Sequence, residues 1–262
     1  MKRLITAVIF IPLFYLYVMK LPGGYFFGLL SVVALLGLYE FYRMFRLNTG
    51  LTVLSISGGL LFLYLSYRGL LAGEGNRSGD FLNLLSLFFI ALVLFRAFIR
   101  KEPRDALRDT GISLTGLVYV VLLITYQLRL RELGPHWIIY LYGVIWISDS
   151  SAYYVGSTIG KRRLYPSLSP KKTVEGAIGS LIGGGIGSVI LGKALDIERA
   201  GLLLGIIIGG LCVVGDLIES MFKRDAGVKD SSNLIPGHGG VLDKIDSALF
   251  VAPFLYWYLM RA

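Results

Sequence analysis

The segment Gly201–Phe222, GLLLGIIIGGLCVVGDLIESMF, decides the class of fold that this sequence can adopt. Apart from Asp216, Glu219 and Ser220, it consists of glycine and of aliphatic, aromatic or sulfur-containing residues. A run of roughly 20 such residues can cross the hydrocarbon core of a bilayer as a helix. The run lacks the alternation of a barrel strand, and a helix satisfies its own backbone hydrogen bonds in lipid. The segment therefore predicts a transmembrane helix that carries two acids.

Apolar segments of this kind recur along the whole chain. Of the 262 residues, 55% are hydrophobic and 16% are charged, whereas a soluble domain has about 25% charged residues. The segments lie near residues 4–20, 24–42, 51–71, 81–99, 110–128, 137–158, 174–195, 201–222 and 246–261. We therefore predict an all-α fold, a polytopic transmembrane bundle of about nine helices.

The lysines and arginines are distributed unequally between the two sides of such a bundle. With nine spans, the N-terminus and every second loop share one side, and 18 of the 26 basic residues fall there. Loops rich in basic residues stay in the cytoplasm, so we expect a cytoplasmic N-terminus. Residues 1–20 lack a small-x-small cleavage site and are expected to remain as the first helix. The net charge of +9 therefore reflects topology and contacts with anionic membrane lipids, and it does not indicate a nucleic-acid partner.

Two polar stretches lie on the predicted cytoplasmic side. Residues 146–180 and 215–247 together contain eight of the 17 acidic residues and nine lysines and arginines. Loops that only connect helices do not need this density of both signs of charge. We therefore divide the chain into N-terminal transmembrane helices, residues 1–135, which form a scaffold with a role in lipid access, and a C-terminal catalytic region, residues 136–262.

Five acids in these stretches fall within or at the ends of apolar segments. Asp149 lies in the sixth segment, Asp216 and Glu219 lie in the eighth, and Asp243 and Asp246 begin the ninth. An ionised carboxylate at membrane depth costs at least about 2.5 kcal/mol, so it normally faces a partner or a water-filled cavity. Internal salt bridges would explain one such acid. Five together predict a metal site, because Mg²⁺ binds carboxylates together with substrate phosphates.

Basic and glycine-rich motifs accompany these acids. Lys171 and Lys172 lie at the predicted start of the seventh helix, where free backbone N–H groups and the helix dipole favour phosphate. The glycines of PGHGG, residues 236–240, allow the backbone to approach a ligand closely. Alone, the first motif would be an interface anchor and the second a tight turn. On one membrane face with the acids, they predict a site that handles phosphate.

Both stretches resemble the signature of the phosphatidate cytidylyltransferase (CDP-diacylglycerol synthase) family. In SMFKRDAGVKDSSNLIPGHGGVLDKID the matching residues are Ser220, Lys223, Arg224, Lys229, Asp230, Pro236, His238, Gly239, Gly240, Asp243 and Asp246. In the upstream block they are Asp149, Ala152, Tyr153, Gly156, Ser169, Pro170, Lys171, Lys172, Thr173, Glu175 and Gly176. Lys244 stands where the family usually has arginine. The resemblance covers the second half of the chain, and the first 135 residues resemble the family only in being hydrophobic helices.

The resemblance implies an enzyme, a nucleotidyltransferase of phospholipid biosynthesis. Such enzymes condense CTP with phosphatidic acid, with Mg²⁺ present, and they form CDP-diacylglycerol and diphosphate. The partners implied are therefore CTP, phosphatidic acid and membrane lipids. The location implied is the inner membrane of the cell, with the active site facing the cytoplasm.

The resemblance, together with the acids Asp216 and Glu219 in the apolar segment before the signature, predicts a role for each of these residues. The catalytic set would be Asp216, Asp243, Asp246, Lys171, Lys172 and His238, with His238 as an orienting group, and proton transfer by it stays open. Mg²⁺, with a second metal ion allowed, would be bound by Asp149, Asp216, Glu219, Asp243 and Asp246. The substrate phosphates would be bound by Ser169, Lys171, Lys172, Thr173, Ser220, Lys223, Arg224, Lys229, Asp230, Gly239 and Gly240.

Two other functions fit parts of the pattern. A membrane kinase that uses CTP to phosphorylate a polyprenol-type lipid would release CDP. An ion-coupled transporter would place its acids near the bilayer midplane within inverted repeats, and no repeat is evident here. In the first three helices, Glu40 is expected to form a local ion pair with Arg43. The small-residue spacing of glycines 176, 179, 183 and 187 predicts close helix packing, within one chain or in a homodimer.

Overall fold

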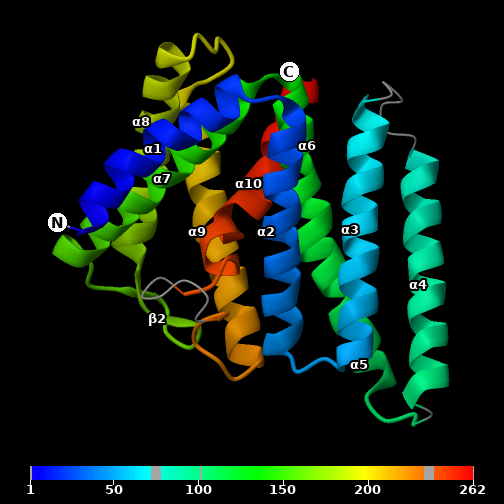
Figure 1. The fold of residues 1–262 in the computed structure, drawn as a ribbon. Helices are drawn as coiled ribbons and strands as arrows, with labels where there is room; N and C mark the ends of the chain where they lie inside the picture. The colour runs from blue at the N-terminus through cyan, green and yellow to red at the C-terminus, as the bar shows by residue number, and fades with distance from the viewer. Residues whose placement is uncertain (1, 72–77, 101, 233–238, 262) are drawn as a thin grey trace.

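The computed structural model describes residues 2–71, 78–100, 102–232 and 239–261, with side chains described from residue 11 onward except at 72–81 and 99–101. The helices are α1 (Lys2–Lys20), α2 (Gly23–Met44), α3 (Thr49–Leu71), α4 (Ser78–Arg100), α5 (Ala106–Gly116), the π-helix η1 (Leu117–Leu122), α6 (Leu123–Leu133), α7 (Pro135–Ile159), α8 (Val174–Ala194), α9 (Leu202–Asp225) and α10 (Leu242–Arg261). The strands are β1 (Arg163–Tyr165) and β2 (Ser169–Thr173). The predicted all-α class is therefore confirmed (Figure 1).

Each predicted apolar segment coincides with a helix, and the boundaries agree to within five residues. The fifth segment is a continuous helical run from α5 through η1 to α6. Gly134, with a φ of 152°, then separates α6 from α7. Pro135 occupies the first position of α7, where a missing backbone N–H costs no helical hydrogen bond. Local chemistry thus explains why the chain breaks between these two segments.

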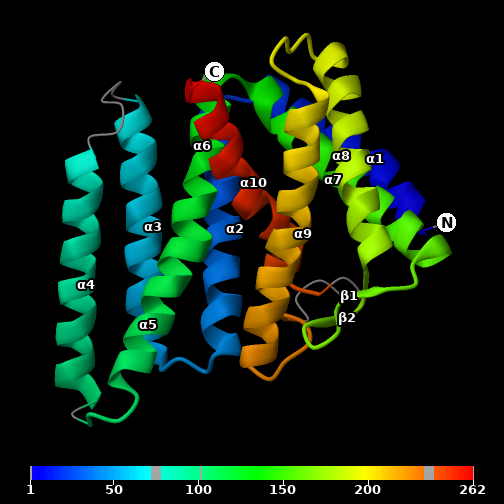
Figure 2. The ribbon, with the colours of Figure 1, turned by 180° about the vertical axis from the view of Figure 1, so that it is seen from behind.

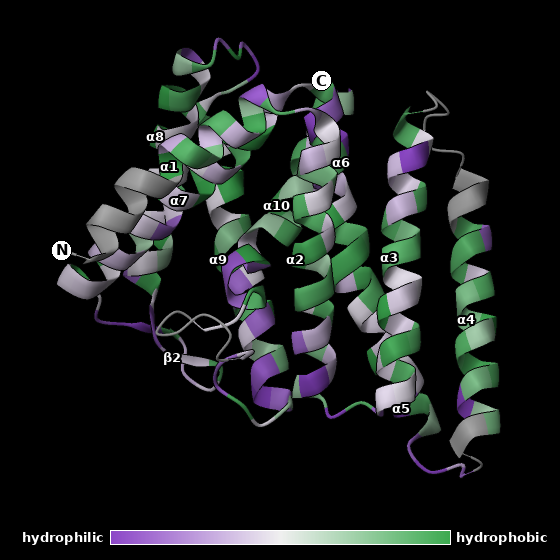
Figure 3. Cartoon of the chain, in the orientation of Figure 1, coloured by the Kyte–Doolittle hydropathy of each residue, from purple (hydrophilic) through white to green (hydrophobic). Residues whose placement is uncertain are grey.

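Among the described residues, five helical segments are long and apolar enough to cross a membrane. They are Gly23–Met44, Thr49–Leu71, Ala106–Leu133, Val174–Ala194 and Leu202–Asp225. Large hydrophobic side chains point outward from such helices, and Leu203 is 72% exposed. Figure 3 shows hydrophobic residues along the helix lengths. Hydrophilic residues lie near the two strands and at the adjacent ends of α2 and α9. The chain is therefore a multi-pass membrane protein.

The helices differ in how closely they pack. Helices α7, α8, α9 and α10 form one group, whereas α3 and α4 stand to one side of the bundle (Figures 1 and 2). Helix α1 crosses α7, and α2 packs beside α6 and η1. We call the end of the bundle that holds β1, β2, the last turn of α9 and the first turn of α10 the hairpin end (Figure 2).

A short antiparallel hairpin, rather than an irregular loop alone, connects α7 to α8. Arg163 pairs with Thr173, and Tyr165 pairs with Ser169. The carboxylate of Glu175 in the first turn of α8 accepts a 3.0 Å hydrogen bond from the Lys161 backbone N–H. The hairpin is thereby held against the start of α8.

Glycines allow α8 to approach α7 very closely. A Cβ atom at Gly179 would lie 3.0 Å from the carbonyl oxygen of Ser151, and one at Gly183 would overlap the Ser151 side chain. Gly176 and Gly187 face α7 in the same way. The prediction of internal packing for these four glycines is confirmed, and a homodimer stays a prediction.

A second set of glycines brings α8 and α9 together backbone to backbone. A Cβ at Gly184 would overlap the carbonyl oxygen of Gly205, and a Cβ at Gly205 would overlap that of Gly184. Gly209 meets the carbonyl oxygen of Ser180 in the same manner. Because backbone atoms cannot turn aside as a flexible side chain can, these contacts fix the distance between the two helices.

We predict that Gly205→Ala destabilises the protein, whereas Gly210→Ala does not. The methyl group at position 205 meets backbone, and overpacking of this kind costs about 1–3 kcal/mol. A Cβ at Gly210, on the same helix, meets nothing within 4 Å. Thermal unfolding in detergent, followed by tryptophan fluorescence, measures the difference. Equal unfolding midpoints for the two variants would contradict this account of the α8–α9 contact.

Candidate active site

A cavity of about 590 Å³ lies among α7, α8, α9, β2 and the first turn of α10. The charged residues that line it are Asp149, Lys171, Lys172, Asp216, Glu219, Lys223, Asp243 and Asp246. The lining therefore has two more acids than lysines. An excess of two acids over lysines favours a cation in the cavity, because a cation would balance their charge.

Three of these acids converge on one point. Asp216 and Glu219 are three residues apart and share a face of α9, and Asp246 approaches from α10. One carboxylate oxygen from each lies within 4.8 Å of the other two. Gly215 permits this approach, since a Cβ there would lie 2.9 Å from the carbonyl oxygen of Asp246. We call Asp216, Glu219 and Asp246 the acid triad.

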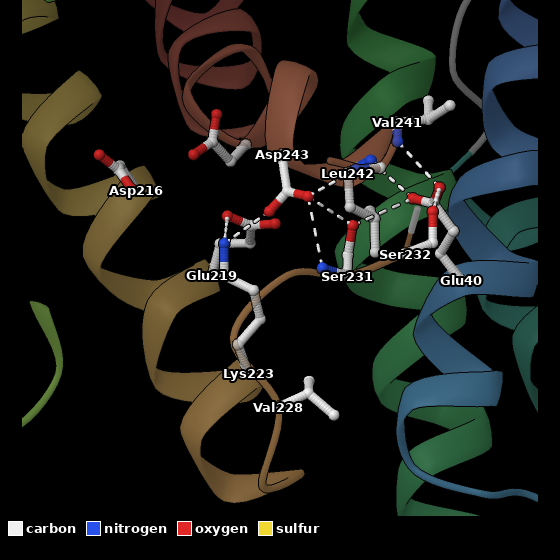
Figure 4. Close-up of polar contacts among 12 residues, drawn as sticks. Glu40, Asp216, Glu219, Lys223, Val228, Ser231, Ser232, Val241, Leu242 and Asp243 are labelled. Carbon is white, nitrogen blue, oxygen red and sulfur yellow. Dashed lines mark hydrogen bonds and ion pairs between the residues drawn. The ribbon is translucent and has the colours of Figure 1, made fainter. Parts of the chain in front are cut away.

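Two lysines meet the acids of the cavity. Lys172 Nζ lies 2.7 Å from Asp216 Oδ2. Lys223 Nζ lies 2.6 Å from Glu219 Oε2 and 2.6 Å from Asp243 Oδ1, so it bridges α9 and α10 (Figure 4). The internal salt bridges that the sequence left open as an alternative are therefore present. They coexist with the acid triad and do not neutralise all of it.

The acid triad fits a hard divalent cation. Glu219 is 2% exposed, and its Oε1 has no hydrogen-bond partner among the described residues. A buried carboxylate oxygen without a partner is costly, and a metal ion would satisfy it. The donors are all carboxylate oxygens, which suit Mg²⁺ rather than a softer metal. The triad is thus the part of the cavity that could hold Mg²⁺.

Buried hydroxyl groups join the three helices that line the cavity. Ser148 Oγ on α7 lies 2.7 Å from Ser180 Oγ on α8, and Ser180 Oγ donates to the Gly209 carbonyl oxygen on α9 at 3.0 Å. At the start of α8, Thr173 Oγ1 accepts a hydrogen bond from the Gly176 backbone N–H. These contacts fix the cavity walls and satisfy polar groups that lipid could not.

The remaining predicted ligands occupy different environments. Asp149 on α7 and Lys171 on β2 line the cavity, as the sequence indicates. Asp243 also lines it, but both of its carboxylate oxygens already have partners. Its Oδ2 accepts hydrogen bonds from Ser231 Oγ at 2.8 Å and from the Gly240 backbone N–H at 2.7 Å. Direct metal binding by Asp243 and Asp149 stays a prediction.

Several residues predicted to bind phosphate do not line the cavity. Arg224 Nε donates to the Leu168 carbonyl oxygen at 3.1 Å, and Arg224 Nη1 donates to that of Val228 at 2.9 Å. Arg224 therefore joins the hairpin to the segment that follows α9. The others outside the lining are Ser169, Ser220, Lys229, Asp230, Gly239 and Gly240. His238 lies outside the described residues.

The prediction of a local ion pair between Glu40 and Arg43 is wrong. Arg43 is exposed and lies over the ring of Tyr39, whereas Glu40 is fully buried and has other partners. The Glu40 carboxylate accepts hydrogen bonds from residues around 231 and 241, far along the chain (Figure 4). The missed signal was an acid inside an apolar segment, the same signal that identified Asp149.

The chain is similar to known proteins along nearly its whole length. The cytidylyltransferase family matches residues 1–261 of the chain. A phosphatidate cytidylyltransferase of Staphylococcus saprophyticus is 35% identical over 265 residues, which cover 100% of this chain and 98% of that protein. The Bacillus subtilis enzyme of the same name is 34% identical, with 98% of this chain and 97% of that protein covered. One from Synechocystis is 36% identical, with coverage of 99% and 96%. The chain therefore belongs to the cytidylyltransferase family.

Proposed function

We propose that this protein is an integral membrane phosphatidate cytidylyltransferase, which converts CTP and phosphatidate into CDP-diacylglycerol and diphosphate. The observation that carries the proposal is the cavity at the hairpin end, where Lys172 of β2 meets the acid triad just before α8 begins. Relatives that match the chain over nearly its whole length have this name. A CTP-dependent kinase or a transporter has no comparable support.

The reaction needs positioning more than acid–base chemistry. A phosphate oxygen of phosphatidate attacks the α-phosphorus of CTP. The attack is in line with the bond from the α-phosphorus to the oxygen that bridges the α- and β-phosphates. The new phosphorus–oxygen bond forms as that bond breaks, and diphosphate leaves with the electron pair. The attacking oxygen is already anionic at neutral pH, so no strong base is required. Charge neutralisation and orientation therefore supply the catalysis.

The residues of the cavity divide this work between them. Lys171 and Lys172 neutralise phosphate charge at the start of α8, where the helix dipole acts in the same direction. Asp216, Glu219 and Asp246 would hold Mg²⁺, which neutralises triphosphate charge when it is bound. Lys172 lies next to Asp216, so the lysine and a metal on that carboxylate could share one phosphate group. His238 is proposed as an orienting group.

We further propose nine membrane spans, with the N-terminus and the hairpin end in the cytoplasm of a cell whose inner membrane holds the protein. CTP is water-soluble and phosphatidate lies in the bilayer, so a site at one end of the bundle gives access to both. The hairpin end also carries the exposed cluster Lys161, Arg162 and Arg163, in keeping with the positive-inside rule.

The metal role of the acid triad predicts that loss of one carboxylate lowers activity without lowering stability. Asp246→Asn and Asp216→Asn should lower turnover about 100-fold or more, because each removes a metal ligand. Asp246 lies among like charges, so its neutralisation should keep or raise the thermal unfolding midpoint in metal-free buffer. The assay supplies labelled CTP, phosphatidate and Mg²⁺ to purified protein and analyses the lipid product.

The matched control for these variants is Asp225→Asn, at the exposed end of the same helix α9. It should make CDP-diacylglycerol at the wild-type rate. Release of CDP in place of diphosphate by the wild-type protein would show a kinase. Near-normal activity of Asp246→Asn and Asp216→Asn at limiting Mg²⁺ would remove the metal assignment.

Replacement of Lys172 should affect CTP more than lipid. Loss of a charge-assisted hydrogen bond worth about 1.5–3 kcal/mol predicts that Lys172→Gln lowers kcat/KM for CTP roughly 10- to 100-fold. Lys172→Arg should recover only part of this, since a planar guanidinium does not reproduce a compact ammonium. Lys161→Gln, exposed and outside the cavity lining, is the control. Steady-state kinetics in mixed micelles that give the two Gln variants the same kcat/KM would contradict the role.

Cysteine labelling tests the proposed topology. In a Cys212→Ser background, Ser167→Cys in the hairpin turn should react with a membrane-impermeant reagent only from the cytoplasmic side. Glu198→Cys, in the loop between α8 and α9 at the opposite end, should react only from outside. Both positions are exposed, so accessibility depends on the side of the membrane alone. Labelling of the two positions from the same side would overturn the arrangement.

A further inference from the structure

Glu40 is a buried acid that the proposed reaction does not use. It lies on α2, in the half of the chain expected to form a scaffold, and it is 0% exposed. No salt bridge joins it to a lysine or arginine among the residues whose side chains are described. A buried carboxylate without a counter-ion must be stabilised by hydrogen-bond donors.

Each oxygen of Glu40 accepts two hydrogen bonds from distant residues. Oε1 accepts from Ser232 Oγ at 2.6 Å and from the Val241 backbone N–H at 2.9 Å. Oε2 accepts from the Leu242 backbone N–H at 2.9 Å and from Ser231 Oγ at 3.3 Å. The carboxylate is thus saturated by donors from two segments that precede and begin α10 (Figure 4).

This contact gives the first turn of α10 a cap supplied by another helix. The first backbone N–H groups of a helix have no partner within it, and a negative charge there also interacts favourably with the helix dipole. Gly240 shows how closely Glu40 approaches, because a Cβ at that position would lie 2.6 Å from both Glu40 oxygens. Ser231 Oγ lies closer still, so Ser231 and Glu40 together leave no room for a side chain at position 240.

A chain of hydrogen bonds connects Glu40 to the acid triad. Ser231 Oγ lies between Glu40 Oε2 and Asp243 Oδ2, at 3.3 and 2.8 Å, so the two carboxylates share its single hydroxyl proton in a three-centre hydrogen bond. Asp243 Oδ1 in turn accepts from Lys223 Nζ, which also bonds Glu219 of the triad. Asp246 lies one turn beyond Asp243 on the helix that Glu40 caps. The connected set in Figure 4 runs from Glu40 on α2 to Glu219 on α9.

We propose that Glu40 is a positioning residue for cytidylyl transfer, which fixes the first turn of α10 so that Asp246 meets Asp216 and Glu219. The proposal rests on the proposed function. It also assigns the N-terminal half of the chain a part in the active site, which the sequence assigned to the second half alone.

The sharpest test is Glu40→Gln, which keeps the shape of the side chain. Glutamine offers one acceptor oxygen, and its amide N–H₂ would face one backbone N–H of the loop, so at least one of the two backbone hydrogen bonds is lost together with the negative charge. The control is Arg43→Gln, exposed and one turn further along α2. Ser232→Ala removes one of the four bonds and serves if Glu40→Gln does not fold.

Two measurements on the full chain separate positioning from general stability. Hydrogen exchange in detergent should be faster at Val241–Ile245 in Glu40→Gln, and unchanged in the loop 195–201 at the opposite end of the bundle. The kcat should fall roughly 10- to 100-fold, the range for residues that orient ligands, and half-saturation should need more Mg²⁺. Ser232→Ala should change both in the same direction by less, and Arg43→Gln should change neither.

Three results would overturn the proposal. One is wild-type exchange and kcat in Glu40→Gln. Another is faster exchange throughout the protein with an unchanged kcat for the folded fraction, which would make Glu40 structural only. The third is a wild-type protein that forms no CDP-diacylglycerol. In that case the proposed function itself fails, and the exchange of Val241 and Leu242 still shows separately whether Glu40 caps α10.

Discussion

The burial of carboxylates inside an apolar bundle is the constraint on which the rest of this structure depends. An acid at membrane depth is tolerated only where a cation, a hydrogen-bond donor or water meets it. Here Asp216 is met by Lys172, and Glu219 by Lys223. Glu40 is met by four donors from the start of α10 and the segment before it. Each of these contacts holds two segments of the chain together. The polar groups therefore determine where helices and connecting segments meet at the hairpin end.

Glycine residues allow the helices to pack closely enough for polar contacts between them to form. Association of helices in lipid gains little from the hydrophobic effect, so close contact and hydrogen bonds must hold them. Helix α8 has glycines on two faces, one against α7 and one against α9. The resulting separation lets Ser180 Oγ bond to groups on both neighbouring helices.

The site therefore combines a rigid frame with an incomplete charge balance. Lys223 satisfies one oxygen of Glu219 and leaves the other without a partner among the described residues. The lining keeps an excess of acids, while Lys171 and Lys172 lie at a helix start that favours phosphate. Such a cavity has both carboxylates and lysines in its lining, so it offers complementary charge to both a cation and an anion.

The sequence by itself determined the helices, the membrane character and the charged residues of the cavity, because these follow from local patterns. Hydrophobic run length locates each helix, and acids within such runs identify Asp149, Asp216 and Glu219 without any knowledge of the fold. Only the tertiary structure decided which charges meet. Asp243 is bonded by Ser231 and Lys223, and Glu40 bonds residues about 200 positions away rather than Arg43. The partner of each charge depends on distances between helices, and these distances cannot be read from the spacing of residues along one helix.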